Sequence, residues 1–370
     1  MRLTIRQPKR CRAEARHLAF IIHGDPFAHA AGITGIVTRR EPMVENHLTA
    51  RAFWVCEPGR GELREVELPA PGPDDVLVRT LRSAISRGTE TIVFRGRVPA
   101  DQRDAMRAPF QQGDFPGPLT YGYLSVGSVE RGPKQLLGRT VFCLHPHQTA
   151  YVVPAGAVAV VPEQVPAARA VLAGTVETAV NALWDAAPLV GDRVTVVGAG
   201  MVGCCVARLL RRFPGIRVAL VDVDPAREET AAALDVEFAL PDEADGGRDL
   251  VFHTSGTSAG LQRSLELLTS EGTVVDLSWY GDEQVHLSLG GAFHSGRLAI
   301  RSSQVGMVAP ARRGSRTPAD RLGLALDLLR DPAFDAILTG SSPFTELPQV
   351  MARLAEGELP ALCHTITYDR

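Results

Sequence analysis

The stretch VTVVGAGMVG, residues 194–203, is a β-branched run that ends in three glycines spaced as Gly-x-Gly-x-x-Gly. Gly198 allows a tight turn from strand to helix, Gly200 lets a pyrophosphate approach the backbone, and Gly203 lets the helix pack closely on its strand. Unpaired N–H groups at a helix start favour an anion. The stretch therefore predicts a dinucleotide-binding turn, with Met201 and Val202 opening the helix. The alternative is a glycine-rich turn that binds nothing.

The sequence after this turn continues the pattern of a nucleotide-binding unit. A helix is predicted to Arg212, and after Pro214-Gly215 a strand over 216–221 ends at Asp222. A carboxylate at this place accepts hydrogen bonds from the adenosine ribose diol and repels a 2′-phosphate. NAD is therefore expected rather than NADP, although Arg227 could soften the preference by pairing with a phosphate.

Two kinds of periodicity divide the chain. Short strands separated by Pro/Gly turns are predicted at 52–55, 63–68, 75–81, 124–130, 140–144 and 151–154, which is typical of a barrel-like β domain. Helices and strands then alternate, with helices at 167–173, 177–186, 225–234 and 258–268 and strands at 250–254, 272–279 and 298–303. This alternation predicts an α/β fold with a Rossmann doubly wound parallel sheet. A helix capped at Thr317-Pro318 that runs to Arg330, a helix at 347–355 and a strand at 364–368 follow.

The composition is that of a globular protein. The chain has 370 residues, 45% of them hydrophobic and 22% charged, which suits two domains. A net charge of −3 gives no electrostatic case for nucleic acid or for an anionic membrane. The six cysteines lack metal-ligand spacing, so we expect reduced thiols and a cytoplasmic location. The longest apolar run, residues 194–207, is too short to span a bilayer.

The first 47 residues differ from the rest, with seven arginines and one lysine against four acidic residues. Three interpretations stay open: a targeting peptide, a disordered tail, or a start codon assigned too far upstream, with Met43 as a natural initiator. Ordered structure is expected to begin near Thr49.

A nucleotide domain that follows a β domain, with a C-terminal segment beyond it, resembles the medium-chain dehydrogenase/reductase superfamily. The resemblance covers about residues 49–370 and implies a GroES-like catalytic domain over 49–176, a Rossmann domain over 177–303, and a segment over 304–370 that returns to the catalytic domain. Residues 1–48 are left outside it as an N-terminal extension. The stretches AISRGTE (84–90), GYLSVG (122–127) and SSQVG (302–306) resemble the branch of bacteriochlorophyllide a 2-hydroxyethyl dehydrogenase.

The same resemblance places the catalytic zinc ligands of other members on Ser86, Tyr123 and Gly174, none of which is a usual zinc ligand. The cysteine lobe that holds a structural zinc is missing as well. We therefore expect no zinc at either site.

Without a Lewis acid, another group must stabilise the alkoxide and move its proton. Tyr123 could act as acid or base if a cation such as Arg87 lowered its pKa, or it could merely fill space. Ser86 and Thr89 could pass a proton to solvent. Glu90 is expected to hold this turn through a backbone cap.

Further polar residues lie near the predicted cleft. The spacing of His145 and His147 could suggest a metal site, but no third ligand is evident in the sequence, so both are assigned to a surface turn. The His253 imidazole is expected to be incidental. The resemblance puts Thr254 and Ser255 beside the nicotinamide. Trp279, followed by Tyr280, forms either the wall of the nicotinamide ribose or domain-interface packing.

These observations predict a zinc-independent, NAD(P)-dependent oxidoreductase acting on a hydroxyl or carbonyl group of a small or medium-sized organic substrate. Two alternatives stay open: a quinone or enoyl (C=C) reductase and a non-catalytic dinucleotide sensor. The expected partner is a small-molecule substrate, and a homodimer is left open.

Overall fold

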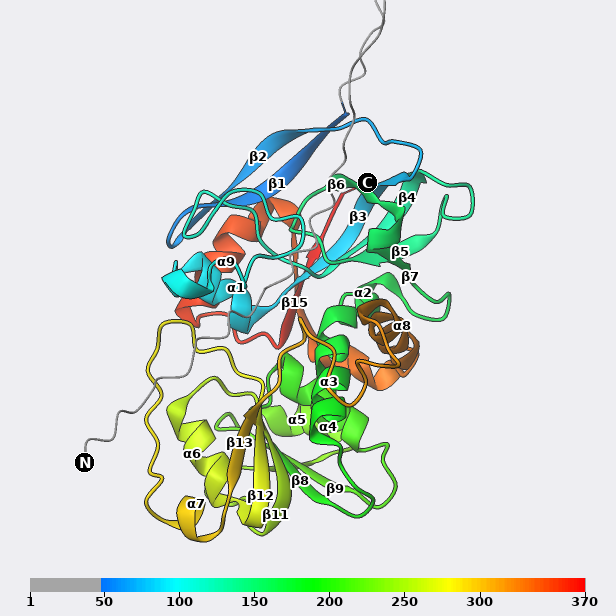
Figure 1. The fold of residues 1–370 in the computed structure, drawn as a ribbon. Helices are drawn as coiled ribbons and strands as arrows, with labels where there is room; N and C mark the ends of the chain where they lie inside the picture. The colour runs from blue at the N-terminus through cyan, green and yellow to red at the C-terminus, as the bar shows by residue number, and fades with distance from the viewer. Residues whose placement is uncertain (1–47, 370) are drawn as a thin grey trace, which may run out of the picture. The chain divides into compact units, whose positions relative to one another are not determined.

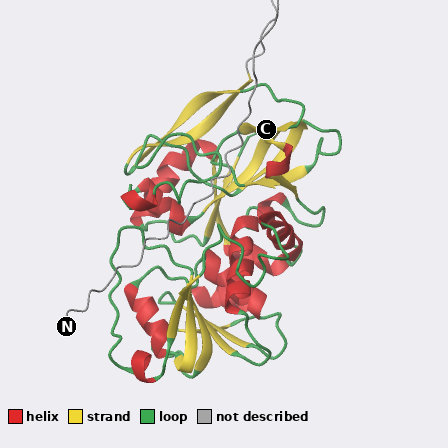
Figure 2. Cartoon of the chain, in the orientation of Figure 1, coloured by secondary structure: helices red, strands yellow, loops and turns green. Residues whose placement is uncertain are grey.

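The computed structural model describes residues 48–369, so the interpretations of the N-terminal extension fall outside the described residues, apart from Leu48. The described chain forms a six-stranded sheet, a seven-stranded sheet and a two-stranded hairpin (Figure 1 and Figure 2). The predicted α/β fold, a Rossmann parallel sheet with a β-rich second domain, is confirmed.

The six-stranded sheet is entirely parallel and has the order β10-β9-β8-β11-β12-β13. Its strands are β8 (Arg193–Val197), β9 (Arg217–Val221), β10 (Glu237–Ala239), β11 (Arg248–His253), β12 (Leu268–Asp276) and β13 (Ala299–Ser302). The chain adds β9 and β10 on one side of β8 and then returns to add β11, β12 and β13 on its other side, so the strand order reverses between β8 and β11. In such sheets ligands bind at this switch point, beyond the carboxyl ends of the strands.

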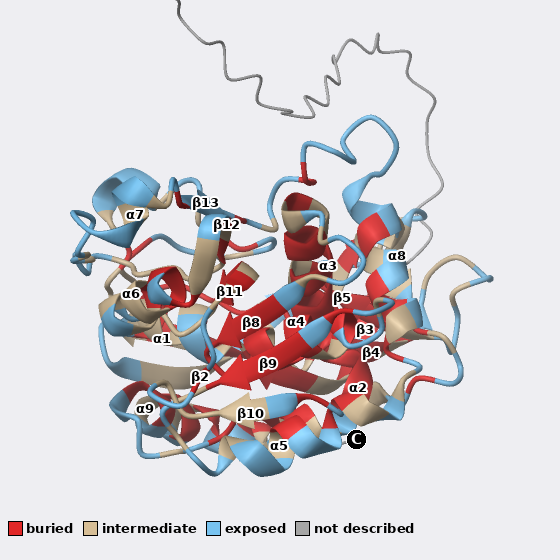
Figure 3. Cartoon of the chain, turned by 90° about the horizontal axis from the view of Figure 1, so that it is seen from below, coloured by how far each residue is buried: buried red, intermediate tan, exposed pale blue. Residues whose placement is uncertain are grey.

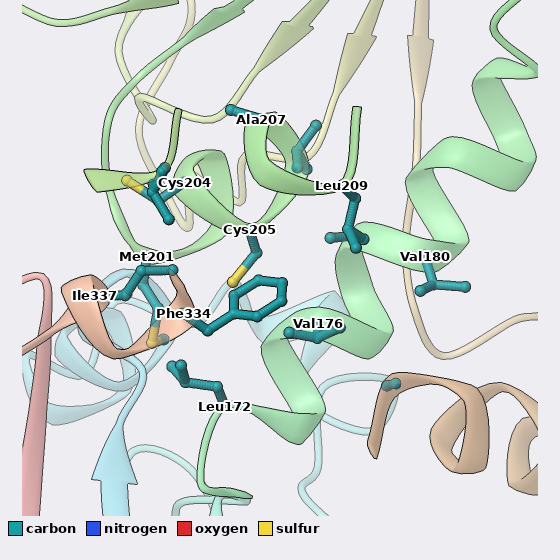
Figure 4. Packing of buried hydrophobic residues seen from close by; sticks show 14 of the residues in the cluster. Leu172, Val176, Val180, Met201, Cys204, Cys205, Ala207, Leu209, Phe334 and Ile337 are labelled. Atoms are coloured by element: carbon teal, nitrogen blue, oxygen red, sulfur yellow. The ribbon is translucent and has the colours of Figure 1, made fainter. Parts of the chain in front are cut away.

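Helices cover both faces of this sheet, because successive residues of each strand point to opposite sides. In β11, Leu250 and Phe252 join the buried cluster that contains Val176 and Cys205, whose packing Figure 4 shows. Val251 joins a different cluster. The strands β8 and β9 are largely buried (Figure 3). The helices are α3 (Ala173–Ala186), α4 (Met201–Leu210), α5 (Arg227–Ala233), α6 (Ser258–Glu266), α7 (Ala292–Ser295) and α8 (Pro318–Leu328).

The seven-stranded sheet has the order β14-β15-β3-β4-β5-β7, and β6 also pairs with β3. The strands are β3 (Asp75–Ile85), β4 (Ser125–Arg131), β5 (Thr140–Cys143), β6 (Ala150–Pro154), β7 (Val158–Val160), β14 (Leu338–Pro343) and β15 (Cys363–Thr367). β15 pairs antiparallel with β3, so the C-terminal segment lies against Ala84 and Ile85. The hairpin is β1 (Leu48–Glu57) and β2 (Arg60–Leu68), and the remaining helices are α1 (Arg87–Phe94), α2 (Ala167–Ala170) and α9 (Leu347–Glu356).

Several elements differ from the sequence prediction. Residues 87–94 form helix α1, where a turn was predicted, and α3 begins at Ala173 and runs across the predicted domain border at 176/177. β12 ends at Asp276, which leaves Trp279 in the following loop. The short strands β7, β10 and β14 were not predicted, because segments of three to six residues carry too little periodicity.

Candidate active site

The turn between β8 and α4 has the geometry that the glycine spacing predicts. Gly198 has φ of +109°, in the region that favours glycine. A Cβ on Gly203 would collide with the Gly198 carbonyl oxygen and with Oγ1 of Thr254. Gly200 precedes α4, and a Cβ there would meet nothing within 4 Å. The first turn of α4 therefore opens on free space, as an anion site requires.

A pocket of about 390 Å³ lies in front of this turn. It brings the predicted catalytic residues Ser86 and Thr89 together with most of the predicted cofactor residues. The latter are Gly200, Met201, Val202, Asp222, Arg227, Thr254, Ser255 and Trp279. Gly198 and Gly203 are not in its wall. Ala361 and Leu362, just before β15, also line it. Sequence reasoning missed this pair, because no local pattern marks an alanine and a leucine so far along the chain as pocket residues.

The Asp222 carboxylate accepts hydrogen bonds from backbone amides of two neighbouring loops. Its Oδ2 accepts a hydrogen bond of 2.6 Å from the Ala199 amide, and its Oδ1 accepts one of 3.0 Å from the Asp224 amide. Arg227 lies 3.2 Å from the Asp224 carboxylate. The guanidinium that could have received a 2′-phosphate is thus already paired with a carboxylate.

Ser86 precedes α1 but does not cap it with its side chain. Instead the Ser86 amide donates a hydrogen bond of 2.7 Å to Oε1 of Glu90. The predicted role of Glu90 as a backbone cap is confirmed, on a helix rather than in a turn. The Ser86 hydroxyl is therefore not consumed in capping, and Ser86 lines the pocket.

Tyr123 is half-buried and is not in the pocket wall, which Ser86 and Thr89 help to form. Burial raises the pKa of Tyr123 to about 12, with a further contribution from the charge of Glu90, while hydrogen bonding from Ser86 and Thr89 acts in the opposite direction. The condition set for a proton-transfer role, a pKa lowered by a cation such as Arg87, is not met, because burial and a carboxylate raise the pKa. The phenol keeps its proton at neutral pH.

His145 and His147 do not lie on a surface turn; both are buried, which corrects the prediction. The His145 ring stacks on Tyr151, with the ring centroids 3.8 Å apart. Burial lowers the pKa of His145 to about 4, so this ring is neutral. His147 lies 2.9 Å from Oε2 of Glu90. The loop over 145–148, His-Pro-His-Gln, looks polar in sequence, and only the packing of the β domain buries it.

The His253 imidazole is not incidental to the loop beside it. Its Nδ1 lies 2.9 Å from Oδ1 of Asp276 and its Nε2 lies 2.7 Å from Oγ of Ser255. Burial acts to raise the pKa of Asp276, but hydrogen bonds from His253 and from the Ser278 amide outweigh it and hold the pKa below its usual value. The imidazole thus ties together the loops that follow β11 and β12, which both line the pocket.

The residues at the predicted metal positions do not fit a zinc ion. Ser86 and Tyr123 carry hydroxyl groups, and a Cβ on Gly174 would strike the Leu124 side chain. Among residues 48–369 no group of three His, Cys, Asp or Glu side chains could hold a metal. The cysteines at 56, 143, 204, 205 and 363 carry free thiols.

Within residues 48–369 no helix is long and apolar enough to cross a membrane.

A larger cavity of about 900 Å³ lies beside α3, α4 and α8. Trp184, Arg208, Phe213 and Asp331 are among its lining residues. None of the predicted site residues lines it. The smaller pocket is the candidate active site, because it alone of the two meets the glycine turn and the switch point of the parallel sheet.

Comparison with known proteins gives the fold a context. No family model matches the chain, and a search of curated proteins found no match. Among solved structures, L-idonate 5-dehydrogenase of Escherichia coli K-12 superimposes with a TM-score of 0.71 at 15% identity, covering 87% of this chain and 99% of the other. A zinc-binding dehydrogenase of Sinorhizobium meliloti 1021 bound to NADP gives 0.69 at 18% identity (86% and 99%). The alcohol dehydrogenase TADH of Thermus sp. ATN1 gives 0.66 at 20% identity (86% and 100%). The chain shares their fold.

Proposed function

We propose that this protein is an NAD(P)-dependent oxidoreductase that transfers a hydride between a nicotinamide cofactor and a carbonyl or hydroxyl carbon, without zinc. One observation carries the proposal: the glycine turn, the acid at the end of β9 and the hydroxyl residues at the start of α1 line one pocket. The dehydrogenases named among the similar structures, one of them bound to NADP, support the same activity. One of these structures is named a zinc-binding dehydrogenase, whereas Ser86, Tyr123 and Gly174 of this chain supply no usual zinc ligand.

The residues of this chain divide the work between binding and proton transfer. The first turn of α4 binds the pyrophosphate through its unpaired amides, and Asp222 binds the adenosine ribose. The bound nicotinamide supplies or takes the hydride. Tyr123 holds the proton that a carbonyl oxygen takes up on reduction, and Ser86 and Thr89, which hydrogen-bond to Tyr123 and line the pocket, pass it on.

Reduction of an activated C=C bond is the second candidate. It needs a hydride and a proton donor but no Lewis acid. The raised pKa of Tyr123 favours this chemistry as much as carbonyl reduction, because the phenol stays protonated. The resemblance to the bacteriochlorophyllide branch does not choose between the two or name a substrate.

The activity is tested by following NADH and NADPH absorbance with panels of alcohols, ketones and enones. We expect turnover on at least one panel, with NADH preferred, and saturable binding of NADH by fluorescence. Binding without turnover on any panel would favour the dinucleotide sensor. Absence of nicotinamide binding would overturn the proposal.

Zinc independence is tested on the same preparation. We expect far less than one zinc per chain by elemental analysis, and unchanged turnover and melting temperature after chelator treatment, because residues 48–369 offer no set of metal ligands. Stoichiometric zinc, or turnover that returns only when zinc is added back, would contradict it.

A further inference from the structure

A chain of buried hydrogen bonds runs behind the pocket. Glu90 accepts from the Ser86 amide at 2.7 Å through Oε1, and its Oε2 lies 2.9 Å from Nε2 of His147. Nδ1 of His147 lies 2.7 Å from Oγ of Ser83, which shares a hydrogen bond of 2.8 Å with the Tyr368 hydroxyl. Glu90 is 3% exposed and His147 1%. A carboxylate and an imidazole this deeply buried need such partners.

His147 also touches the segment that carries Tyr123. A Cβ built on Gly122 would lie 2.8 Å from Cδ2 and 3.0 Å from Nε2 of the His147 ring. Gly122 has φ of +119°, so glycine is required there for its conformation as well as for the close approach. One imidazole therefore contacts both Glu90 of α1 and the backbone beside Tyr123.

We propose that Glu90 and His147 form a positioning pair. The pair fixes residues 84–91, which carry Ser86, relative to residues 120–124, which carry Tyr123. The two segments are the ones where the superfamily resemblance puts metal ligands, and here a buried carboxylate–imidazole pair holds them together. The catalytic consequence rests on the proposed function, but the positioning itself does not.

The alternative to positioning is a proton relay through Glu90. Substitution distinguishes them, because Glu90→Gln keeps an acceptor for the Ser86 amide and supplies a donor for Nε2 of His147, whereas it removes the group that could carry a proton. Glu90→Ala removes both contacts. A positioning role predicts that Glu90→Gln keeps the slow exchange and the turnover that Glu90→Ala loses. A relay predicts that both variants lose turnover.

The test that needs no substrate is hydrogen–deuterium exchange of the full chain. We expect His147→Ala and Glu90→Ala to speed exchange by about tenfold or more in peptides over both 84–91 and 120–124, because local opening follows lost packing. Glu90→Gln should stay near the unmodified rate in both. His145→Ala is the matched control: it removes a buried imidazole from the same loop that contacts neither segment through a hydrogen bond, and exchange over 84–91 should not change.

If His147→Ala does not fold, the Glu90→Ala and Glu90→Gln pair carries the test alone. Exchange over 120–124 that stays unchanged in Glu90→Ala would overturn the coupling. On a substrate found by the absorbance screen, Glu90→Ala should lower kcat by ~10-fold or more while NADH affinity holds, and Gln should restore kcat. Failure of every substrate would bear on the proposed function and leave the exchange result standing.

Discussion

At the residue scale, proton donation by Tyr123 is the step of the proposed mechanism that a single substitution tests most directly. Tyr123→Phe removes one hydroxyl and keeps the ring. Because this hydroxyl is the proposed proton donor, the substitution should lower turnover by ~10²–10⁴-fold and leave NADH affinity unchanged. Tyr121→Phe is the matched control, because that hydroxyl donates to the Met106 carbonyl instead. Turnover of Tyr123→Phe within about threefold of the unmodified protein would move the role to Ser86, Thr89 or water.

The pH dependence follows from the same group. The pKa of Tyr123 is raised to about 12, so the phenol is protonated at every pH well below that value. A reduction that uses it as a donor should show no loss from this group between about pH 7 and pH 9. An oxidation that needs the phenolate should instead speed up as pH rises, and an initial-rate profile in both directions checks the sign.

Asp222 governs the cofactor prediction. Asp222→Ser removes a charge that would repel a 2′-phosphate, so the NADH-to-NADPH affinity ratio should fall by roughly fivefold, or about 1 kcal/mol at a solvated site. Fluorescence titration with both cofactors measures it. Asp224→Asn is the companion variant, because it frees Arg227 without touching the ribose acid. Tighter binding of NADPH than NADH by the unmodified protein would refute the assignment.

At the scale of elements, α8 is fastened to α3 by a buried arginine. Arg321 is 2% exposed and lies 3.0 Å from Oε1 of Glu177, and it also donates to the Val305 carbonyl at 2.6 Å. One guanidinium therefore links α8, α3 and the SSQVG stretch. The start of α8 is confirmed as the sequence predicts it: Thr317 and Asp320 form a capping box with Pro318 in the first turn.

Arg321→Ala leaves the Glu177 carboxylate buried without its partner, and we expect a loss of about 3–5 kcal/mol in the free energy of unfolding. Urea unfolding by circular dichroism measures it. Arg316→Ala, on the exposed approach to α8, should change stability by no more than about 0.5 kcal/mol. A loss from Arg321→Ala as small as this control would mean that the apolar packing alone holds α8.

At the scale of the molecule, the two sheets belong to lobes that meet at the pocket. Arg97, after α1, lies 2.8 Å from Asp282 and 2.7 Å from Glu283, which follow β12 in the other lobe. Trp279 lines the pocket and packs against the buried cluster that contains Phe94 and Tyr121, as domain-interface packing requires, while its role as a wall of the nicotinamide ribose stays a prediction. The pocket therefore depends on segments from both lobes and from the C-terminal return.

The sequence by itself determined the fold class and the place of the nucleotide turn. Glycine spacing, strand alternation and the Thr317 cap are local signals, and each acts within a few residues of the chain. Only the tertiary structure decided which residues surround that turn. Glu90 meets His147 across 57 residues, and Ala361 reaches the pocket because β15 pairs with β3. Such contacts come from sheet order and burial, which no local pattern encodes. Burial also explains why His147, predicted at the surface, lies in the core beside Glu90. It is likewise the main cause of the raised pKa of Tyr123.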